Sequence, residues 1–134
     1  MMVVDTSALI SILKREDLAD ACERALALES HVIISAGTLV EARIVTLRAG
    51  RGSDLGEIIA ANISEVIPVT HERARFISDV YWSWGKGFHP ASLNFGDCFA
   101  YATAKEFDCP LLYVGNDFAQ TDVRAALAGS SSPM

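Results

Sequence analysis

Short apolar runs alternate along the chain with stretches of helical periodicity, and this alternation is the feature that most constrains the fold. Helical patterns follow each of the first three runs and precede the fourth. We therefore expect an α/β domain with a central, mostly parallel sheet of four to five strands and helices on both faces. Strands are predicted at 3–4, 32–34, 66–69 and 111–114, with a fifth near 123–127, and helices at about 6–13, 18–28, 36–49, 53–61, 71–84 and 95–107.

The length of 134 residues fits one domain, which we place at residues 1–128. Residues 129–134, Gly-Ser-Ser-Ser-Pro-Met, are expected to form a flexible C-terminal tail. No run approaches the ~20 apolar residues of a membrane span, and the N-terminus lacks a basic segment and cleavage site typical of a signal peptide. We expect a cytoplasmic protein with no membrane partner.

Periodicity also predicts which helix faces are buried. Trp82 is expected to point away from the core, where a dimer contact is favoured over base stacking. Pro68 predicts an edge position for the third strand. Three cysteines without a C-x-x-C pair are expected in the core and not in a zinc site or disulfide. The predicted core stripes are Ala36, Val40, Ile44 and Leu47 in the third helix, bordered by Glu41, and Ala74, Ile77, Tyr81 and Trp84 in the fifth.

Acidic residues gather where a parallel α/β sheet places its ligands, at the carboxyl ends of the strands. Asp5 ends the first strand, Glu41 lies in the helix after the second, and Asp117 follows the fourth. Asp97 lies in the first turn of the sixth helix, beside Gly96. A glycine inside a helix costs about 0.5–1 kcal/mol relative to alanine, so it suggests close packing or approach of a ligand there.

Each of these acids also has a purely structural interpretation. Asp5 can cap a helix, Glu41 can be a solvated helix residue, and Asp97 can be an ordinary first-turn acid. Taken together, carboxylates without histidine or cysteine select hard cations, Mg²⁺ or Mn²⁺. Such ions support cleavage of phosphodiesters.

The net charge of −6 argues against binding to nucleic acid, which usually requires a basic surface. Divalent ions held by clustered acids would neutralise or invert that charge locally. The net charge alone therefore favours an acidic enzyme or binding module, whereas the clustered acids favour a metal-dependent enzyme that acts on nucleic acid. The motifs decide between these two functions.

Four sequence blocks, in order, resemble VapC toxins, which are PIN-domain ribonucleases. The resemblance extends from Val3 to about Leu127. The four blocks are Val3–Leu9 (VVDTSAL), Thr38–Ala42 (TLVEA), Asn94–Ala102 (NFGDCFAYA) and Leu111–Phe118 (LLYVGNDF).

This resemblance implies a PIN-like fold and Mg²⁺-dependent endonucleolytic cleavage of structured RNA, such as transfer or ribosomal RNA, with Mn²⁺ as a substitute ion. It implies that Asp5, Glu41 and Asp97 are the core metal-binding acids, that Asp117 is the fourth, and that Thr6 steadies the site. It also implies a VapB-type antitoxin as partner and a homodimeric chain.

The fourth acid is the least settled assignment, because Asp117 and Asp122 both follow the fourth strand. The turn at Gly115 and Asn116 can direct Asp117 toward Asp5, so we expect Asp117 to be the ligand. Asp122 is expected to act in a supporting or structural role, as is Asn116. Two weaker candidates for substrate contact are Arg48 and Arg51.

The first strand and the residues after it also bear on other functions of α/β domains. A haloacid-dehalogenase phosphatase needs D-x-D-x-T after its first strand, but Thr6 and Ser7 follow Asp5. A receiver-like signalling domain would need an adjacent acidic pair there. A PIN-like nuclease of RNA or DNA processing that is not a toxin is the main alternative, and an inert interaction protein is less compatible with the set of acids.

Overall fold

The structure is a computed structural model that describes residues 1–127. The predicted flexible tail at 129–134 lies outside the described residues. The strands are β1 (Met2–Val4), β2 (Val32–Ser35), β3 (Glu65–Ile67) and β4 (Leu111–Leu112). The helices are α1 (Thr6–Leu13), α2 (Ala19–Leu28), α3 (Ala36–Arg48), α4 (Gly52–Asn62), α5 (His71–Trp84) and α6 (Phe95–Glu106).

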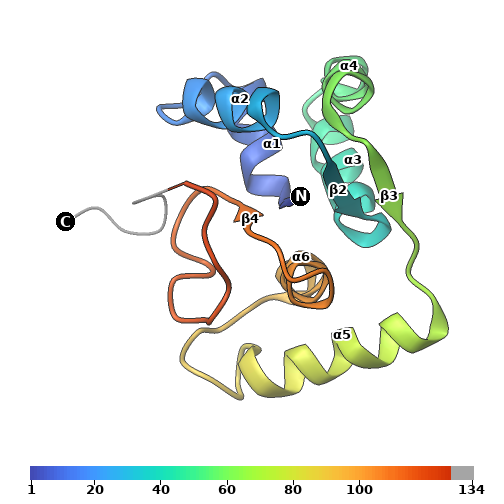
Figure 1. Cartoon of the computed structure of the whole chain (residues 1–134), viewed down its shortest axis with the longest axis vertical. Coiled ribbons are helices and arrows are strands. Elements are labelled where there is room, and N and C mark those ends of the chain that lie inside the picture. The colour runs from blue at the N-terminus through green and yellow to red at the C-terminus, as the bar shows by residue number, and fades with distance from the viewer. Residues whose placement is uncertain (128–134) are drawn as a thin grey trace.

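The four strands form one parallel sheet in the order β3-β2-β1-β4 (Figure 1). The edge position predicted for the third strand from Pro68 is confirmed, since β3 has β2 as its only strand partner among the described residues. The predicted fifth strand is reduced to one parallel bridge, in which Leu111 pairs with Ala125. The carboxyl ends of β1, β2 and β4 therefore meet at one end of the sheet.

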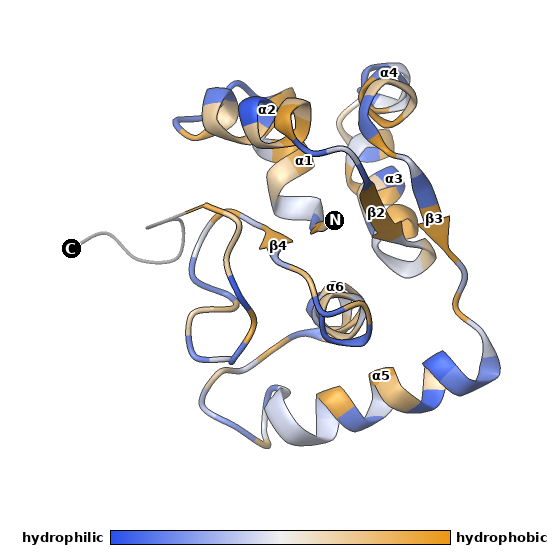
Figure 2. Ribbon diagram, viewed as in Figure 1, coloured by the Kyte–Doolittle hydropathy of each residue, from blue (hydrophilic) through white to orange (hydrophobic). Residues whose placement is uncertain are grey.

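Helices cover both faces of the sheet, as the sequence predicts (Figure 1). Val3, Ile33 and Leu111 pack on the side of α5 and α6, whereas Val4 and Ile34 pack on the side of α1, α2 and α4. Figure 2 shows β2 and β4 as predominantly hydrophobic. Each such side chain, when fully buried, contributes about 1.5–3 kcal/mol to the stability of the fold relative to exposure. Packing on both faces therefore holds the strands, and the residues at their ends, in place.

The core stripe predicted for the third helix is wrong. Val40, Ile44 and Leu47 are 56%, 52% and 75% exposed, and the buried residues of α3 are Thr38, Ala42 and Thr46. The reason is close helix packing, because α3 lies against both α1 and α6, and the residues it buries fully are small. Large apolar residues are displaced to the outer face, where they form an exposed apolar row.

The stripe predicted for the fifth helix is correct for three of its four residues, Ile77, Tyr81 and Trp84, which pack on the core. Ala74 is exposed instead, and Val80 is buried. Trp82 is 70% exposed and points away from the core as expected. The three cysteines are buried and free, also as expected.

Among residues 1–127, no helix combines the length and apolar character needed to cross a membrane.

Candidate active site

Asp5 is held at the junction between β1 and α1. It is the N-cap of α1, and its Oδ2 accepts hydrogen bonds from Ser7 N at 3.0 Å and Ser7 Oγ at 2.6 Å. The structural interpretation of Asp5 is therefore correct, and it leaves the second oxygen for another role. Asp5 Oδ1 is buried without a hydrogen-bond partner among the described residues. A buried carboxylate oxygen without a donor is costly unless a cation or proton partner completes it.

Ser7 is a site residue that the sequence reasoning missed. Its hydroxyl donates to Asp5 and accepts a hydrogen bond from Val114 N at 3.0 Å. This contact joins the start of α1 to the chain that leaves β4, across 107 positions of sequence. The signal was present, because a side chain two residues after an N-cap aspartate commonly hydrogen bonds near it.

Glu41 is fixed by contacts from two other elements. Thr6 Oγ1 donates to Glu41 Oε1 at 2.7 Å, which gives the hydroxyl a positioning contact. Gly96 lies so close to this carboxylate that an ideal Cβ at that position would overlap it, with Glu41 Cδ only 2.6 Å away. The close approach predicted at Gly96 is confirmed, and what approaches it is Glu41.

Asp97 lies at the N-terminus of α6 within a capping box. Asn94 N donates to Asp97 Oδ2 at 3.0 Å, and Asp97 N donates to Asn94 Oδ1 at 2.9 Å. Its carboxylate is buried beneath the helix end. The capping contact holds the side chain in place and uses one of its two oxygens.

The four acids lie near enough to one another for their charges to interact. The pKa of Asp5 is raised from 3.8 to about 6, because burial outweighs the opposing hydrogen bonds from Ser7 and the nearby charges of Glu41 and Asp117 add to the rise. Burial likewise raises the pKa of Asp97 to about 7, against the backbone hydrogen bond from Asn94, with Asp117, Asp5 and Glu41 adding repulsion. No lysine or arginine within residues 1–127 forms a salt bridge with any of the four.

The two candidate fourth acids lie in different surroundings. Asp117 is exposed in the loop after β4, near enough for its charge to raise the pKa of Asp5 and Asp97. Asp122 instead accepts hydrogen bonds from Tyr101 and from Lys105 Nζ, and the bond from Tyr101 is the main cause of its lowered pKa. Asp122 thus ties the C-terminal loop to α6.

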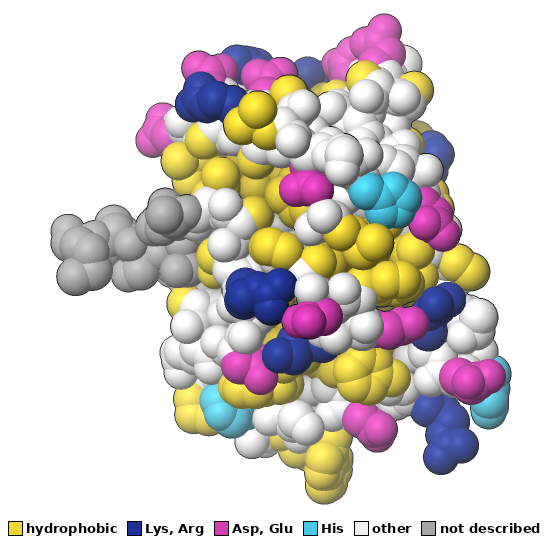
Figure 3. Space-filling model, viewed as in Figure 1, with side chains coloured by type: hydrophobic (Ala, Val, Ile, Leu, Met, Phe, Trp, Pro, Cys, Tyr) yellow, Lys and Arg dark blue, Asp and Glu magenta, His cyan; other side chains and the backbone are white. Residues whose placement is uncertain are grey.

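Asn116, Arg48 and Arg51 make no hydrogen bond to the four acids among the described residues. The carbonyl of Asn116 accepts a hydrogen bond from Ala119 N in the loop. Arg51 is engaged by Asp54 at 2.6 Å and by the carbonyl of Leu13 at 3.0 Å. Arg48 is exposed at the end of α3. On the face seen in Figure 3, basic side chains are scattered among acidic ones and form no single basic patch.

The donor set fits a hard cation. It consists of carboxylates, with the unpartnered Asp5 Oδ1 among them, and carboxylate oxygen is the ligand that Mg²⁺ and Mn²⁺ prefer. Within residues 1–127, no three side chains of His, Cys, Asp or Glu stand together as a ready-made metal site. The acids therefore fit a metal ion by their chemistry and their proximity. One oxygen of Glu41 accepts a hydrogen bond from Thr6, and one oxygen of Asp97 accepts a hydrogen bond from Asn94.

Known proteins resemble this chain in sequence and in fold. Residues 2–124 match the family described as PIN domain. The VapC ribonuclease Mb0625 of Mycobacterium bovis and the ribonuclease VapC28 of Mycobacterium tuberculosis are each 44% identical over 131 residues, covering 94% of this chain and 98% of the relative.

Solved structures share the fold at low sequence identity. Mycobacterium tuberculosis VapC20, described as a sarcin–ricin loop cleaving toxin, aligns with a TM-score of 0.71 at 17% identity, covering 92% of this chain and 96% of that one. A toxin–antitoxin complex from Klebsiella pneumoniae aligns with a TM-score of 0.69 at 18% identity, covering 91% and 93%. The PIN-like α/β fold expected from the sequence is confirmed.

Proposed function

Because the chain belongs to the VapC ribonucleases of the PIN-domain family, we propose that it is the toxin of a VapB–VapC pair and cleaves structured RNA with Mg²⁺. The observation that carries the proposal is the cluster of Asp5, Glu41, Asp97 and Asp117. These four acids come from separate segments, and no basic side chain of the described residues neutralises them. Such a cluster is unfavourable unless cations complete it.

In this proposal the four carboxylates hold Mg²⁺, or Mn²⁺ in its place. The ion supplies Lewis-acid chemistry that polarises the scissile phosphodiester and lowers the pKa of the attacking water. The chain itself supplies orientation. Ser7 fixes the Asp5 carboxylate, Thr6 fixes Glu41, and Asn94 fixes Asp97. Preorganisation of this kind matters because a site misplaced by about 1 Å can lose roughly a hundredfold in rate.

The proposed substrate is a structured RNA of the transfer or ribosomal class, cleaved in the cytoplasm. VapC20, which shares the fold, is described as cleaving the sarcin–ricin loop, and this supports an RNA substrate for the present chain. Arg48 remains a candidate for phosphate contact. Arg51 is a weaker one, since Asp54 and the Leu13 carbonyl already engage its guanidinium.

The proposal is tested by incubating the purified chain with transfer and ribosomal RNA. Cleavage is expected with Mg²⁺ or Mn²⁺ and is expected to stop when EDTA removes the ion, because the acids then repel one another and the phosphate. Sequencing the new RNA ends would identify the cleaved position. Cleavage that continues unchanged in EDTA would contradict the proposed metal site.

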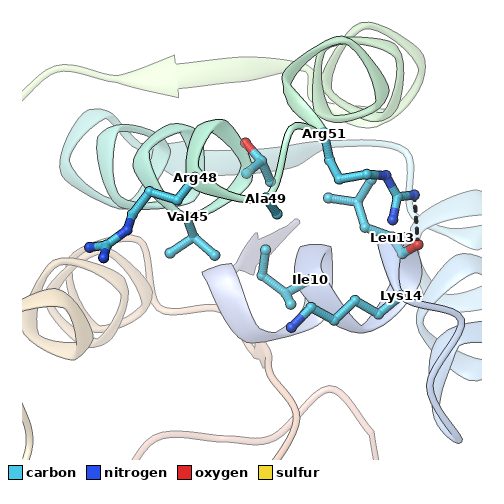
Figure 4. A pocket seen from close by; sticks show the side chains of 8 residues that line it. Ile10, Leu13, Lys14, Val45, Arg48, Ala49 and Arg51 are labelled. Atoms are coloured by element: carbon cyan, nitrogen blue, oxygen red, sulfur yellow. Dashed lines mark hydrogen bonds between the residues drawn. The ribbon is translucent and has the colours of Figure 1, made fainter.

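A groove between α1 and α3 is the proposed docking site for the antitoxin (Figure 4). It has a volume of about 490 Å³, and apolar side chains lie at its centre with basic ones around them. Figure 4 shows Ile10 and Val45 between Lys14 and Arg48. An apolar segment flanked by acids would match this chemistry. The groove is lined by Ile10, Leu13, Lys14, Val45, Thr46, Arg48, Ala49 and Arg51.

The homodimer expected from the sequence is proposed to use a different surface, the exposed apolar row of α3 formed by Val40, Ile44 and Leu47. These side chains share one face of the helix outside the groove, and such unpartnered apolar faces commonly mark protein contacts.

Val45→Asp is expected to weaken antitoxin binding at least about tenfold, because it places a charge in the apolar centre of the groove. RNA cleavage by the variant is expected to stay near the wild-type rate, since Val45 lies outside the acidic cluster. Calorimetric titration with a VapB-type antitoxin that binds the wild-type chain measures the change. Leu47→Asp is the matched control on the same helix and is expected to change the oligomeric mass in light scattering while leaving antitoxin affinity intact. If Val45→Asp instead changes the oligomeric mass and Leu47→Asp weakens antitoxin binding, the groove is the dimer surface and the apolar row of α3 is the antitoxin surface.

A further inference from the structure

Phe95 is a large aromatic side chain that remains in solvent beside the acidic cluster. It is the first residue of α6, and its side chain is 77% exposed. The next residue, Gly96, lies directly against the Glu41 carboxylate, so the start of α6 borders the acidic cluster. Exposure of a phenylalanine so close to a reactive site calls for a partner that covers it.

The Phe95 ring packs against a second aromatic side chain of the same helix. It meets Phe99 edge-on, with centroids 5.1 Å apart and an interplanar angle of 82°. Phe99 is itself fixed, because it packs so closely on Gly37 of α3 that a Cβ there would overlap its ring. Phe95 is therefore held in place and presents its ring to solvent at little further entropic cost.

A small apolar hollow lies on the other side of Phe95, between α5 and α6. Its volume is about 250 Å³, below the roughly 300–1,000 Å³ of sites for drug-sized ligands, which suits one planar ring system. Tyr81 forms a wall that is fixed by its own contacts, a hydrogen bond to Lys86 O at 3.2 Å and an edge-on contact with Phe88. The lining consists of Ile77, Ser78, Tyr81, Phe95 and Cys98.

The hydroxyl and thiol groups of this lining already donate hydrogen bonds within the protein. Ser78 Oγ donates to Ala74 O at 2.9 Å, and Cys98 Sγ donates to Asn94 O at 3.3 Å. The hollow therefore offers an apolar wall, an aromatic ring and a few acceptors. That combination favours an aromatic ligand held by stacking over one held by several donated hydrogen bonds.

We propose that Phe95 and this hollow form a subsite for one unpaired nucleobase next to the scissile phosphate of the RNA. The inference rests on the proposed ribonuclease function and adds to it a residue that determines specificity. Proteins that read RNA sequence mostly stack splayed, unpaired bases on aromatic side chains. Stacking of a base on an aromatic ring contributes about 1–3 kcal/mol and does not itself involve the charge of the protein.

The test measures binding of a short single-stranded RNA, and of the same strand carrying abasic sites, in Ca²⁺. Phe95→Ala is expected to weaken binding of the intact strand roughly fivefold to a hundredfold, whereas Phe95→Trp retains it. The abasic strand should bind the wild-type chain with the same loss, and Phe95→Ala should then lose nothing further. Trp82→Ala is the matched control, a similarly exposed aromatic on α5 outside the hollow.

Several outcomes would overturn the subsite: unchanged affinity in Phe95→Ala, losses from the variant and the abasic sites that simply add, or a loss carried by Trp82→Ala instead. A variant that loses antitoxin affinity but keeps RNA affinity would assign the hollow to the partner protein. Cleavage of the same RNA in Mg²⁺ is measured separately. If RNA binding depends on Phe95 but no RNA is cleaved, the proposed ribonuclease function is wrong and the subsite stands. If RNA is cleaved but neither binding nor cleavage depends on Phe95, the subsite is wrong and the proposed function stands.

Discussion

Asp97→Asn is expected to lower RNA cleavage by at least about a hundredfold while leaving the fold intact. An amide is a far weaker ligand for Mg²⁺ than a carboxylate, and loss of metal assistance costs several kcal/mol of transition-state stabilisation, where each 1.4 kcal/mol is about tenfold in rate. The amide oxygen can still accept the hydrogen bond from Asn94 N, so the capping box at the start of α6 is retained.

The same substitution is expected to stabilise the metal-free chain. The pKa of Asp97 is raised from 3.8 to about 7 in the folded state, so the folded chain keeps a proton that the unfolded chain has released. Stability from this group is complete below about pH 4 and is lost as the pH rises through about 7. An asparagine cannot ionise and avoids that loss, on the order of 2–4 kcal/mol at neutral pH.

Thermal unfolding in EDTA from pH 4 to pH 8 measures this effect. The variant should melt at about the wild-type temperature near pH 4 and several degrees higher at pH 8. Added Mn²⁺ should raise the melting temperature of the wild type far more than that of the variant, since an ion that binds only the folded state stabilises it. A variant that cleaves RNA at the wild-type rate would show that Asp97 is not part of the site.

The position of the acids could be predicted from the sequence because it depends on topology. Asp5 directly follows β1 and Asp117 lies in the loop after β4, and the parallel sheet brings strand ends together without any detail of side-chain packing. The edge position of β3 followed in the same way from Pro68. These inferences rest on backbone geometry, which a short stretch of sequence determines well.

The burial of α3 could not be predicted in this way. Its periodicity indicates an apolar stripe that includes Val40 and Ile44, yet contact with α1 and α6 selects Thr38 and Ala42. Which face of a helix is buried depends on how close its neighbours come, and that distance is a property of the assembled fold. The contact between Ser7 and Val114 was missed for the same reason, since it joins segments 107 positions apart.

Gly96→Ala is expected to abolish most cleavage while making α6 intrinsically more stable. Alanine in a helix interior is favoured over glycine by about 0.5–1 kcal/mol. The added Cβ, however, would occupy the space of the Glu41 carboxylate, whose Cδ would be 2.6 Å away. Glu41 must then leave its contact with Thr6, or α3 and α6 must separate. Either change moves one of the four acids, and a displacement of about 1 Å is enough for roughly a hundredfold loss of rate.

Gly56→Ala is the matched control, because Gly56 also lies within a helix but has no atom within 4 Å of an added Cβ. This variant is expected to cleave RNA at the wild-type rate and to gain stability of about 0.5–1 kcal/mol. Rates of RNA cleavage and denaturant unfolding of both variants make the comparison. If Gly96→Ala keeps full activity, Glu41 does not need its place against α6, and its assignment to the metal site would have to be withdrawn. If the double variant Gly96→Ala/Glu41→Ala is no slower than Gly96→Ala alone, the glycine acts through Glu41, because two changes to one interaction do not add.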